Sequence, residues 1–467
     1  MQRTLFEKMW SAHVVSDFGD SRALIHIDRH VVHEGTSAEA FAGLRKAART
    51  VHSPDLTFAV TDHIVSTIPG RNADTFPPGR ERVSLLQQNC AEAGIPLFDL
   101  DDPRQGIAHV VAPELGIALP GATLVCGDSH TATCGGVGAY AWGIGTTEVQ
   151  QVLATQALIV RKPKALRVNF SGRVSEGIYA KDLILALIRR YGVAAGTGYA
   201  IEYAGSVIRG LGVEGRMTIC NMSIEFGARS GFVAPDDTTI SYLAERPFRP
   251  RGKDWDAALA SWRELRSDSD AQFDDEFEID CSALAPQVSW GTSPQSVIGV
   301  DERIPDPSAP PHPETSATVR KALEYMELEP GRPIEGLPID IAFIGSCTNS
   351  RLSDLQAAAE IVRGRRVAPG VRALVVPGSM QVKRAAEGLG LDRIFSESGF
   401  EWRSAGCSMC VAANEDVVPP GKRSISTSNR NFENRQGPAA RTHLASPAMV
   451  AAAALKGRIV DLRKLAS

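Results

Sequence analysis

The sequence predicts an α/β protein with mostly parallel sheets. Short apolar runs typical of strands alternate along the chain with helix-like runs, which is the pattern of repeated strand–helix units. The 467 residues are enough for about three domains. The composition, with 43% hydrophobic and 22% charged residues, is that of an ordinary folded protein.

The expected elements follow in chain order. The first part of the chain predicts a strand-like run LTFAV (56–60), a helix over 80–93 that Gly94 ends, a strand over 96–100, a buried strand over 123–126 and a helix over 146–159 with Thr146 or Thr147 as N-cap. The later part predicts an amphipathic helix over 180–191 closed by Gly192, a strand over 339–344, a helix over 352–362 and a strand over 372–376.

Two changes in composition indicate domain boundaries. One lies near residues 162–164, and the other is a proline-rich stretch around one short helix. We therefore expect domains at 1–164, 165–303 and 339–467, with 304–338 as a linker.

Charge and hydropathy exclude several classes of protein. There are 50 Lys and Arg against 54 Asp and Glu, so the net charge of −4 argues against a nucleic-acid-binding surface. No apolar run has the length of a membrane span, and the N-terminus lacks the apolar core of a secretory signal. We expect a cytoplasmic protein without a nucleic-acid or membrane partner.

Three cysteines form the first chemical motif. Cys347 directly follows an apolar strand, and Cys407 and Cys410 form a C-x-x-C pair 60 positions later. Thiolates at the carboxyl edge of an α/β sheet can converge. Three thiolates suit either a zinc site completed by a His or an iron–sulfur cluster with one iron left open, and simple redox use is a further alternative. The other five cysteines are expected to be small core residues: Cys90, Cys126, Cys134, Cys220 and Cys281.

Histidines beside carboxylates form the second motif. A carboxylate fixes the tautomer of a His and raises its basicity, as general acid–base chemistry requires, although a structural role is the alternative for any one of them. Residues four apart on a helix share a face, so Asn221 and Glu225 are expected to project together. The other candidates follow strand-like runs or lie between them: Asp62, His63, His109, Asp128 and His130.

An arginine-rich turn is the third motif. Asn429, Arg430 and Arg435 form a dense donor group suited to carboxylates or phosphates, with a salt-bridged surface turn as the alternative. Residues 127–131 do not match the nucleophile elbow of hydrolases, because the fifth position is Thr. Residues 136–141 match a dinucleotide fingerprint but lack the preceding strand and the later acidic residue.

In combination, the motifs IGSCTNSR, GCSMC, CGDSHTAT and TSNRNF resemble those of the aconitase family. The resemblance extends from IDRHVVHEGTSAEAF (27–41) to RTHLASPAM (441–449), essentially the whole chain. It is strongest to the two-chain branch that isomerises 2-isopropylmalate and 3-isopropylmalate by dehydration and rehydration, in leucine biosynthesis. It implies an aconitase-like three-domain α/β/α core around an iron–sulfur cluster, with the swivel domain absent.

The resemblance also implies the site. One [4Fe–4S] cluster per subunit would be held by Cys347, Cys407 and Cys410. The catalytic His–carboxylate pairs would be Asp62–His63, His109–Asp128 and His130–Glu225. The substrate-binding residues would be His30, Ser129, Asn221, Asn429, Arg430 and Arg435.

A partner is implied as well. In two-chain members of the family a separate small subunit carries the swivel domain, so we expect a heterodimer or a higher assembly. Cys134, Met380 and Asn434 depart from the usual residues near the motifs, where a His and two Gly are common. Another 2-substituted malate therefore stays an alternative substrate: citramalate, dimethylmalate, benzylmalate or homocitrate. An RNA-binding regulator, and a zinc-stabilised or electron-transfer protein, are the alternatives from other functional classes.

Overall fold

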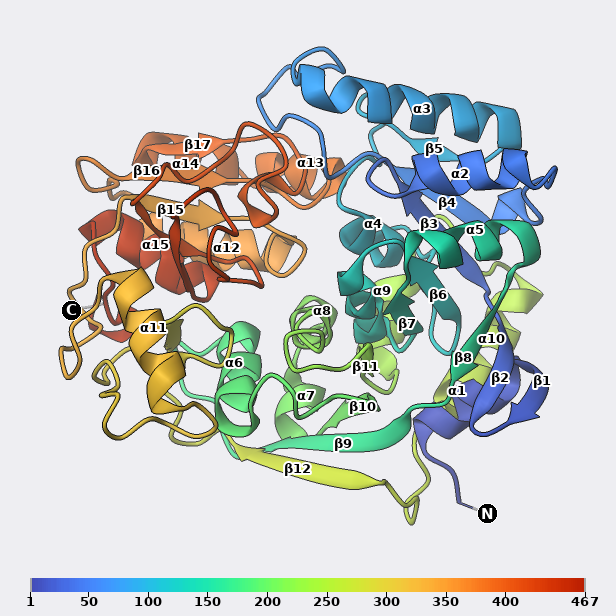
Figure 1. The fold of residues 1–467 in the computed structure, drawn as a ribbon, viewed down its shortest axis with the longest axis horizontal. Coiled ribbons are helices and arrows are strands. Elements are labelled where there is room, and N and C mark those ends of the chain that lie inside the picture. The colour runs from blue at the N-terminus through green and yellow to red at the C-terminus, as the bar shows by residue number, and fades with distance from the viewer. Residues whose placement is uncertain (1, 466–467) are drawn as a thin grey trace. The chain divides into compact units, whose positions relative to one another are not determined.

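The computed structural model describes residues 2–465 (Figure 1). The chain divides into two compact units. Unit 1 comprises Met1–Ile64, Phe76–Ser171 and Gly196–Ile279, and unit 2 comprises Val65–Thr75, Gly172–Ala195 and Asp280–Ser467. The domains expected at 1–164, 165–303 and 339–467 do not coincide with these units, because residues 165–303 are divided between both of them. The three-domain division stays a prediction.

The main sheet of unit 1 has five parallel strands in the order β5-β4-β3-β6-β7. Their bounds are β3 Arg29–His33, β4 Thr57–Val60, β5 Leu97–Phe98, β6 Thr123–Cys126 and β7 Tyr140–Gly143. Successive residues of a strand point to opposite faces, and both faces are covered. Val32 belongs to the core formed with α2 (Ser37–Lys46), α3 (Pro77–Ala93) and α5 (Thr146–Thr155). Val31 belongs to the core formed with α4 (Ala108–Glu114) and α8 (Val213–Asn221).

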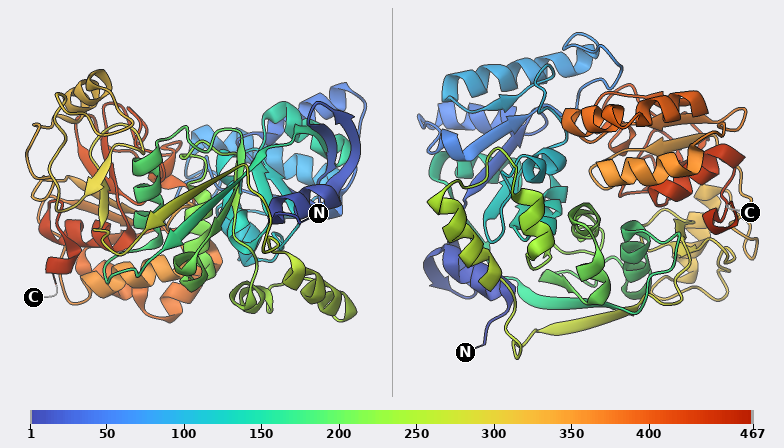
Figure 2. Two further views of the ribbon diagram at one scale, coloured as in Figure 1. Left: turned by 90° about the horizontal axis from the view of Figure 1, so that it is seen from below. Right: turned by 180° about the vertical axis from the view of Figure 1, so that it is seen from behind.

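Two smaller sheets complete unit 1. One is antiparallel, in the order β1-β2-β8, with β1 Val14–Gly19, β2 Arg22–His26 and β8 Ala157–Arg161. The other has the order β11-β10-β9-β12, with β9 Lys164–Ser171, β10 Tyr199–Ala204, β11 Ser230–Phe232 and β12 Asp275–Asp280. The long strands β9 and β12 lie side by side (Figure 2). The remaining helices are α1 Leu5–His13, α7 Ser206–Gly210, α9 Asp237–Leu243 and α10 Lys253–Glu264.

Unit 2 contains a second five-stranded parallel sheet, in the order β17-β16-β15-β18-β19. Its strands are β15 Ile341–Ile344, β16 Arg372–Val375, β17 Phe400–Trp402, β18 Arg423–Ser426 and β19 Arg441–Leu444. The helices of the unit are α6 Ala180–Tyr191, α11 Ser316–Met326, α12 Leu352–Val362, α13 Met380–Gly388, α14 Leu391–Ser398 and α15 Pro447–Lys456. A short antiparallel pair joins β13 Gln287–Ser289 to β14 Val297–Gly299.

The predicted α/β class with parallel sheets is confirmed. The strand over 123–126 and the helices over 180–191 and 352–362 have the predicted bounds. Gly94 ends α3 in a left-handed conformation (φ +70°), as a glycine C-cap does. Within residues 2–465, no helix is both long and apolar enough to span a bilayer.

One helix prediction has the correct first residue, Thr146, but the wrong C-terminal end and the wrong N-cap. The helix expected over 146–159 ends at Thr155, because Gln156 adopts a left-handed conformation and β8 begins at Ala157. Alternate residues of β8 are buried where it pairs with β2, so a two-residue period replaces the helical one. The N-cap is Gly145 rather than a threonine.

Candidate active site

In unit 1 the candidate residues gather where three neighbouring parallel strands end. β3 lies between β4 and β6, with His33 paired to Val60 and Val31 paired to Cys126. Asp62 and His63 lie just after β4, and Asp128 lies just after β6. The carboxyl ends of parallel strands are where α/β proteins place their ligand sites.

Asp128 is an acceptor shared by two histidines. Its Oδ1 accepts from His109 Nε2 at 2.9 Å and from the backbone N–H of His130 at 2.7 Å. Its Oδ2 accepts from His63 Nε2 at 3.0 Å. Burial alone would raise the pKa of Asp128, but His109 and the other donors hold it well below its usual value. Asp128 is therefore an anion in the folded protein.

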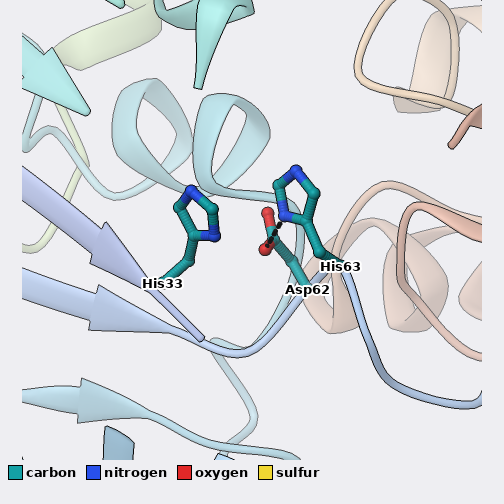
Figure 3. A group of neighbouring side chains, drawn as sticks. All are labelled: His33, Asp62 and His63. Carbon is teal, nitrogen blue, oxygen red and sulfur yellow. Dashed lines mark hydrogen bonds and ion pairs between the residues drawn. The ribbon is translucent and has the colours of Figure 1, made fainter. Parts of the chain in front are cut away.

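His63 lies between two carboxylates, of which Figure 3 draws Asp62. Its Nδ1 is 2.5 Å from Asp62 Oδ1, while its Nε2 faces Asp128. Burial would lower the pKa of His63, but the charge of Asp62 and the hydrogen bond to Asp128 raise it well above 6.5. Because carboxylates can only accept, both ring nitrogens carry protons. His63 is thus a charged imidazolium, able to donate a proton.

Glu225 holds the third expected histidine. His130 Nε2 donates to Glu225 Oε1 at 2.9 Å, and Ser129 Oγ lies 3.2 Å from His130 Nδ1. Asn221 Nδ2 donates to Thr133 Oγ1 at 2.8 Å, within the loop that carries His130. The expectation that Asn221 and Glu225 share a helical face was wrong, because α8 ends at Asn221 and Glu225 lies in the turn beyond it.

His30 does not join this group. It lies near the start of β3, where it pairs with Thr57 and Val125, three residues before the strand's carboxyl end. Its side chain is fully buried, and neither ring nitrogen has a hydrogen-bond partner among the described residues. Burial lowers the pKa of His30 to about 3, so the ring is neutral. Its substrate-binding role stays a prediction.

Two neighbouring residues were missed. The ring of His33 stacks on that of His63, with centroids 4.4 Å apart, and burial lowers the pKa of His33 (Figure 3). The fully buried carboxylate of Glu34 accepts the backbone N–H groups of Asp62, His63 and Ile64 at 3.2, 2.6 and 2.6 Å. Glu34 thereby fixes the segment that carries His63. The sequence position of Glu34, directly after the apolar run of β3, could have indicated this role, since the loop after a parallel strand lies at the carboxyl edge of the sheet.

In unit 2, two loops bring thiols together. Cys347 follows β15, while Cys407 precedes and Cys410 ends the short η3 turn (Ser408–Cys410) after β17. None of the three is in a disulfide, and all are nearly buried, with 6–7% exposure. Ser346 Oγ donates to Cys410 Sγ at 3.0 Å, and Asn429 Nδ2 donates to Cys347 Sγ at 3.6 Å. Two loops distant in sequence therefore share polar neighbours.

The backbone of these loops is held in unusual conformations. Ser346 (φ +77°) and Ser408 (φ +49°) occupy the left-handed region, which non-glycine residues rarely do. Arg351, itself buried, donates to the carbonyl oxygens of Cys347 at 2.7 Å and Thr348 at 2.9 Å. The surrounding structure thus fixes the Cys347 loop in a form suited to presenting its thiol.

The ligand geometry separates the two metal alternatives. Tetrahedral zinc, with Zn–S bonds of about 2.3 Å, needs four ligand atoms within about 4 Å of one another. Across residues 2–465, only His33, Asp62 and His63 bring three such atoms within 4.8 Å. The hydroxyl and amide donors to Cys410 and Cys347 fit a larger iron–sulfur group, whose sulfurs and ligands accept such hydrogen bonds.

The arginine-rich turn lies after β18. Asn429 contacts two of the thiols, since Cys410 Sγ also donates to its Oδ1 at 3.7 Å. Arg430 and Arg435 are half-buried. The Arg435 Nε is buried without a hydrogen-bond partner in the described part of the chain, which leaves this donor for an anion.

The three departures from the family pattern have structural places. Asn434 adopts a left-handed conformation (φ +64°), which glycine and Asn adopt more readily than other residues. Cys134 is fully buried in the core of unit 1. Met380 begins α13, after an N-cap at Ser379 that does not depend on it.

Comparisons with known proteins show the family of the chain. Residues 7–457 match the model of the aconitase family (aconitate hydratase). The chain is 57% identical over 463 residues to 3-isopropylmalate dehydratase large subunit 1 of Bradyrhizobium diazoefficiens, covering 99% of this chain and 97% of that protein. A crystal structure of Thermococcus kodakaraensis aconitase X aligns with a TM-score of 0.46 at 12% identity, over 91% of this chain and 89% of that one. The chain belongs to the aconitase family.

Proposed function

We propose that this chain is the catalytic large subunit of a hydro-lyase that isomerises 2-isopropylmalate and 3-isopropylmalate in leucine biosynthesis. The observation that carries the proposal is the 57% identity, over nearly the full length of both chains, to a 3-isopropylmalate dehydratase large subunit. The His–carboxylate contacts of unit 1 and the three thiols of unit 2 support it with the chemistry that the reaction needs.

The reaction removes a C–H proton beside a carboxylate and expels hydroxide, and neither step is easy at neutral pH. A protonated His63 can supply a proton to the departing hydroxyl group. Asp128 would hold His63 and His109 in the protonated tautomers that face it. His130, held by Glu225, would order water for addition to the other carbon of the alkene.

Cys347, Cys407 and Cys410 would bind a [4Fe–4S] cluster. When bound, such a cluster with one iron free of protein ligands supplies a Lewis acid. We assign Asn429, Arg430 and Arg435 to the charged ends of the substrate, because guanidinium groups pair with carboxylates through forked hydrogen bonds. Ser129, Asn221 and His30 keep their assignment as further substrate-binding residues.

A separate small subunit would carry the swivel domain. The words "large subunit" in the relative's name support a two-chain enzyme. We also propose a cytoplasmic location, because none of the eight cysteines is in a disulfide, as expected in a reducing compartment.

An anaerobic assay tests the proposal. The chain is co-purified with its small subunit, reconstituted with iron and sulfide, and given a panel of 2-substituted malates while the unsaturated acid is followed by ultraviolet absorbance. We expect isopropylmalate to react fastest. Preference for citramalate, dimethylmalate, benzylmalate or homocitrate would keep the mechanism and change the pathway. An intact cluster with bound partner and no turnover on any of them would overturn the proposed function.

A further inference from the structure

A lysine in the core of unit 2 has no place in the reaction described above. Lys181 is the second residue of α6, and its side chain is fully buried. Its Nζ donates to the backbone carbonyl oxygens of Thr427 and Ser428, each at 2.5 Å. These two residues directly follow β18 and precede Asn429.

The position is costly for a cation. A buried ammonium loses its hydration, and carbonyl groups replace that loss only in part. The first turn of a helix also disfavours positive charge, because the helix dipole is positive at that end. The adjacent Asp182 uses its carboxylate to accept the backbone N–H groups of Tyr179 at 2.8 Å and Gln287 at 2.7 Å. Helix stability therefore does not explain a lysine at this position.

The segment that Lys181 holds leads directly to the thiols. Asn429 Nδ2 is 3.6 Å from Cys347 Sγ, and its Oδ1 is 3.7 Å from Cys410 Sγ. The Thr427 hydroxyl bridges to the Cys347 loop as well, accepting from Gly345 N and donating to Gly345 O, both at 2.8 Å. A continuous set of contacts within unit 2 thus joins the ammonium to two of the three thiols.

We propose that Lys181 is a positioning residue for the thiol site: it fixes the 427–429 segment, and so the Asn429 amide, against Cys347 and Cys410. It also places a positive charge on the backbone of the segment that leads to Asn429. Positive charge and hydrogen bonds near the sulfurs stabilise the more reduced, more negative state of an iron–sulfur cluster. This second part rests on the proposed function, whereas the positioning of Asn429 does not.

The test compares K181M and K181Q with R189M, all in the full-length chain. Arg189 lies on the same helix and pairs with Glu302 at the surface, so R189M removes a cation without touching the 427–429 segment. In the chain without iron, hydrogen exchange of the 427–431 peptide and the alkylation rates of Cys347 and Cys410 are measured. In the reconstituted chain, the rate of iron loss to a chelator and the reduction midpoint potential of the cluster are measured.

We expect K181M to speed iron loss and exchange of the 427–431 peptide by roughly tenfold, because a charge-assisted hydrogen bond is lost. We expect a more negative midpoint potential in K181M and K181Q, and wild-type behaviour in R189M. A potential unchanged in a folded, loaded K181Q would overturn the electrostatic part. If K181M matched R189M in exchange and alkylation, the positioning role would be wrong, and K181Q decides the same point if K181M does not fold. A wild-type chain that binds no iron would instead refute the proposed function and the electrostatic part, while the exchange readout would still decide the positioning role.

Discussion

Replacing Asp128 with asparagine should lower both the stability of unit 1 and the rate of the reaction. The carboxylate accepts from two imidazole N–H groups, at 3.0 and 2.9 Å, and from one backbone N–H at 2.7 Å. An amide has one oxygen, so at least one N–H group would face a donor. A hydrogen bond to a charged group is worth about 1.5–3 kcal/mol, and we expect D128N to lower the free energy of unfolding by that amount. Turnover should fall by about 10²–10⁴-fold, the usual contribution of a general acid–base group.

The loss of stability should depend on pH. The raised pKa of His63 stabilises the fold fully below its unfolded value of 6.5, and this contribution disappears as pH rises through the folded pKa. The lowered pKa of Asp128 stabilises the fold above 3.8, and this contribution disappears as pH falls through its folded pKa. The difference between wild type and D128N is therefore largest between about pH 4 and pH 6.5.

Urea unfolding at several pH values measures this difference in free energy of unfolding. Hydrogen exchange of the peptides that contain β4 and β6 then shows whether the loss of stability is local. The matched control is D102N, which removes the carboxylate that pairs with Arg104 in unit 1, an arginine whose side chain is 42% exposed, and it should cost at most about 1 kcal/mol. If D128N and D102N cost the same at pH 6, or if the cost of D128N were no smaller at pH 10, the charged state assigned to His63 and Asp128 would be wrong.

Three further changes test other parts of the site. E34Q places an NH₂ group against backbone N–H groups that the wild-type carboxylate accepts. It should therefore lower the free energy of unfolding in urea by about 1–3 kcal/mol and slow turnover. If the free energy of unfolding and the turnover rate were both unchanged, the positioning role of Glu34 would be wrong. A Cβ at Gly143 would lie 2.4 Å from a backbone oxygen and 2.7 Å from a Cα of the turn after β6, so G143A should lower the free energy of unfolding by about 1–3 kcal/mol. G210A, with open space around the added Cβ, should not lower it. Equal melting temperatures of the two variants would refute the clash. C347S should bind little iron by elemental analysis, while C281S should bind as much as wild type; iron retained in C347S would remove Cys347 from the ligand set.

The local elements could be predicted because their signals are local. The strand over 123–126 is continuously apolar, and the helix over 180–191 has an apolar face and a closing glycine. The end of α5 could not, since Ala157–Arg161 is apolar enough for either structure until pairing with β2 decides. Tertiary contacts of this kind override local preference.

The site shows the same division. Motifs placed histidines, carboxylates and thiols at strand ends, and the structure brings Asp62 to His63, His109 to Asp128 and His130 to Glu225. The sharing of Asp128 between two histidines was not predictable, because it depends on the register of β4 and β6 on either side of β3. Glu34 and Lys181 were missed because their partners are backbone groups distant in sequence, which leave no residue pattern.

We propose that Cys347, Cys407 and Cys410 bind a cluster in which the iron without a protein ligand binds the substrate. Mössbauer spectroscopy of the reconstituted chain with its small subunit, before and after addition of 2-isopropylmalate, tests it most directly. We expect the substrate to change the signal of one iron site and leave the thiolate-bound irons as they were, since only the iron without a protein ligand is open. If 2-isopropylmalate left the spectrum unchanged in a preparation with full cluster content, the substrate would not bind this iron and the proposal would be wrong.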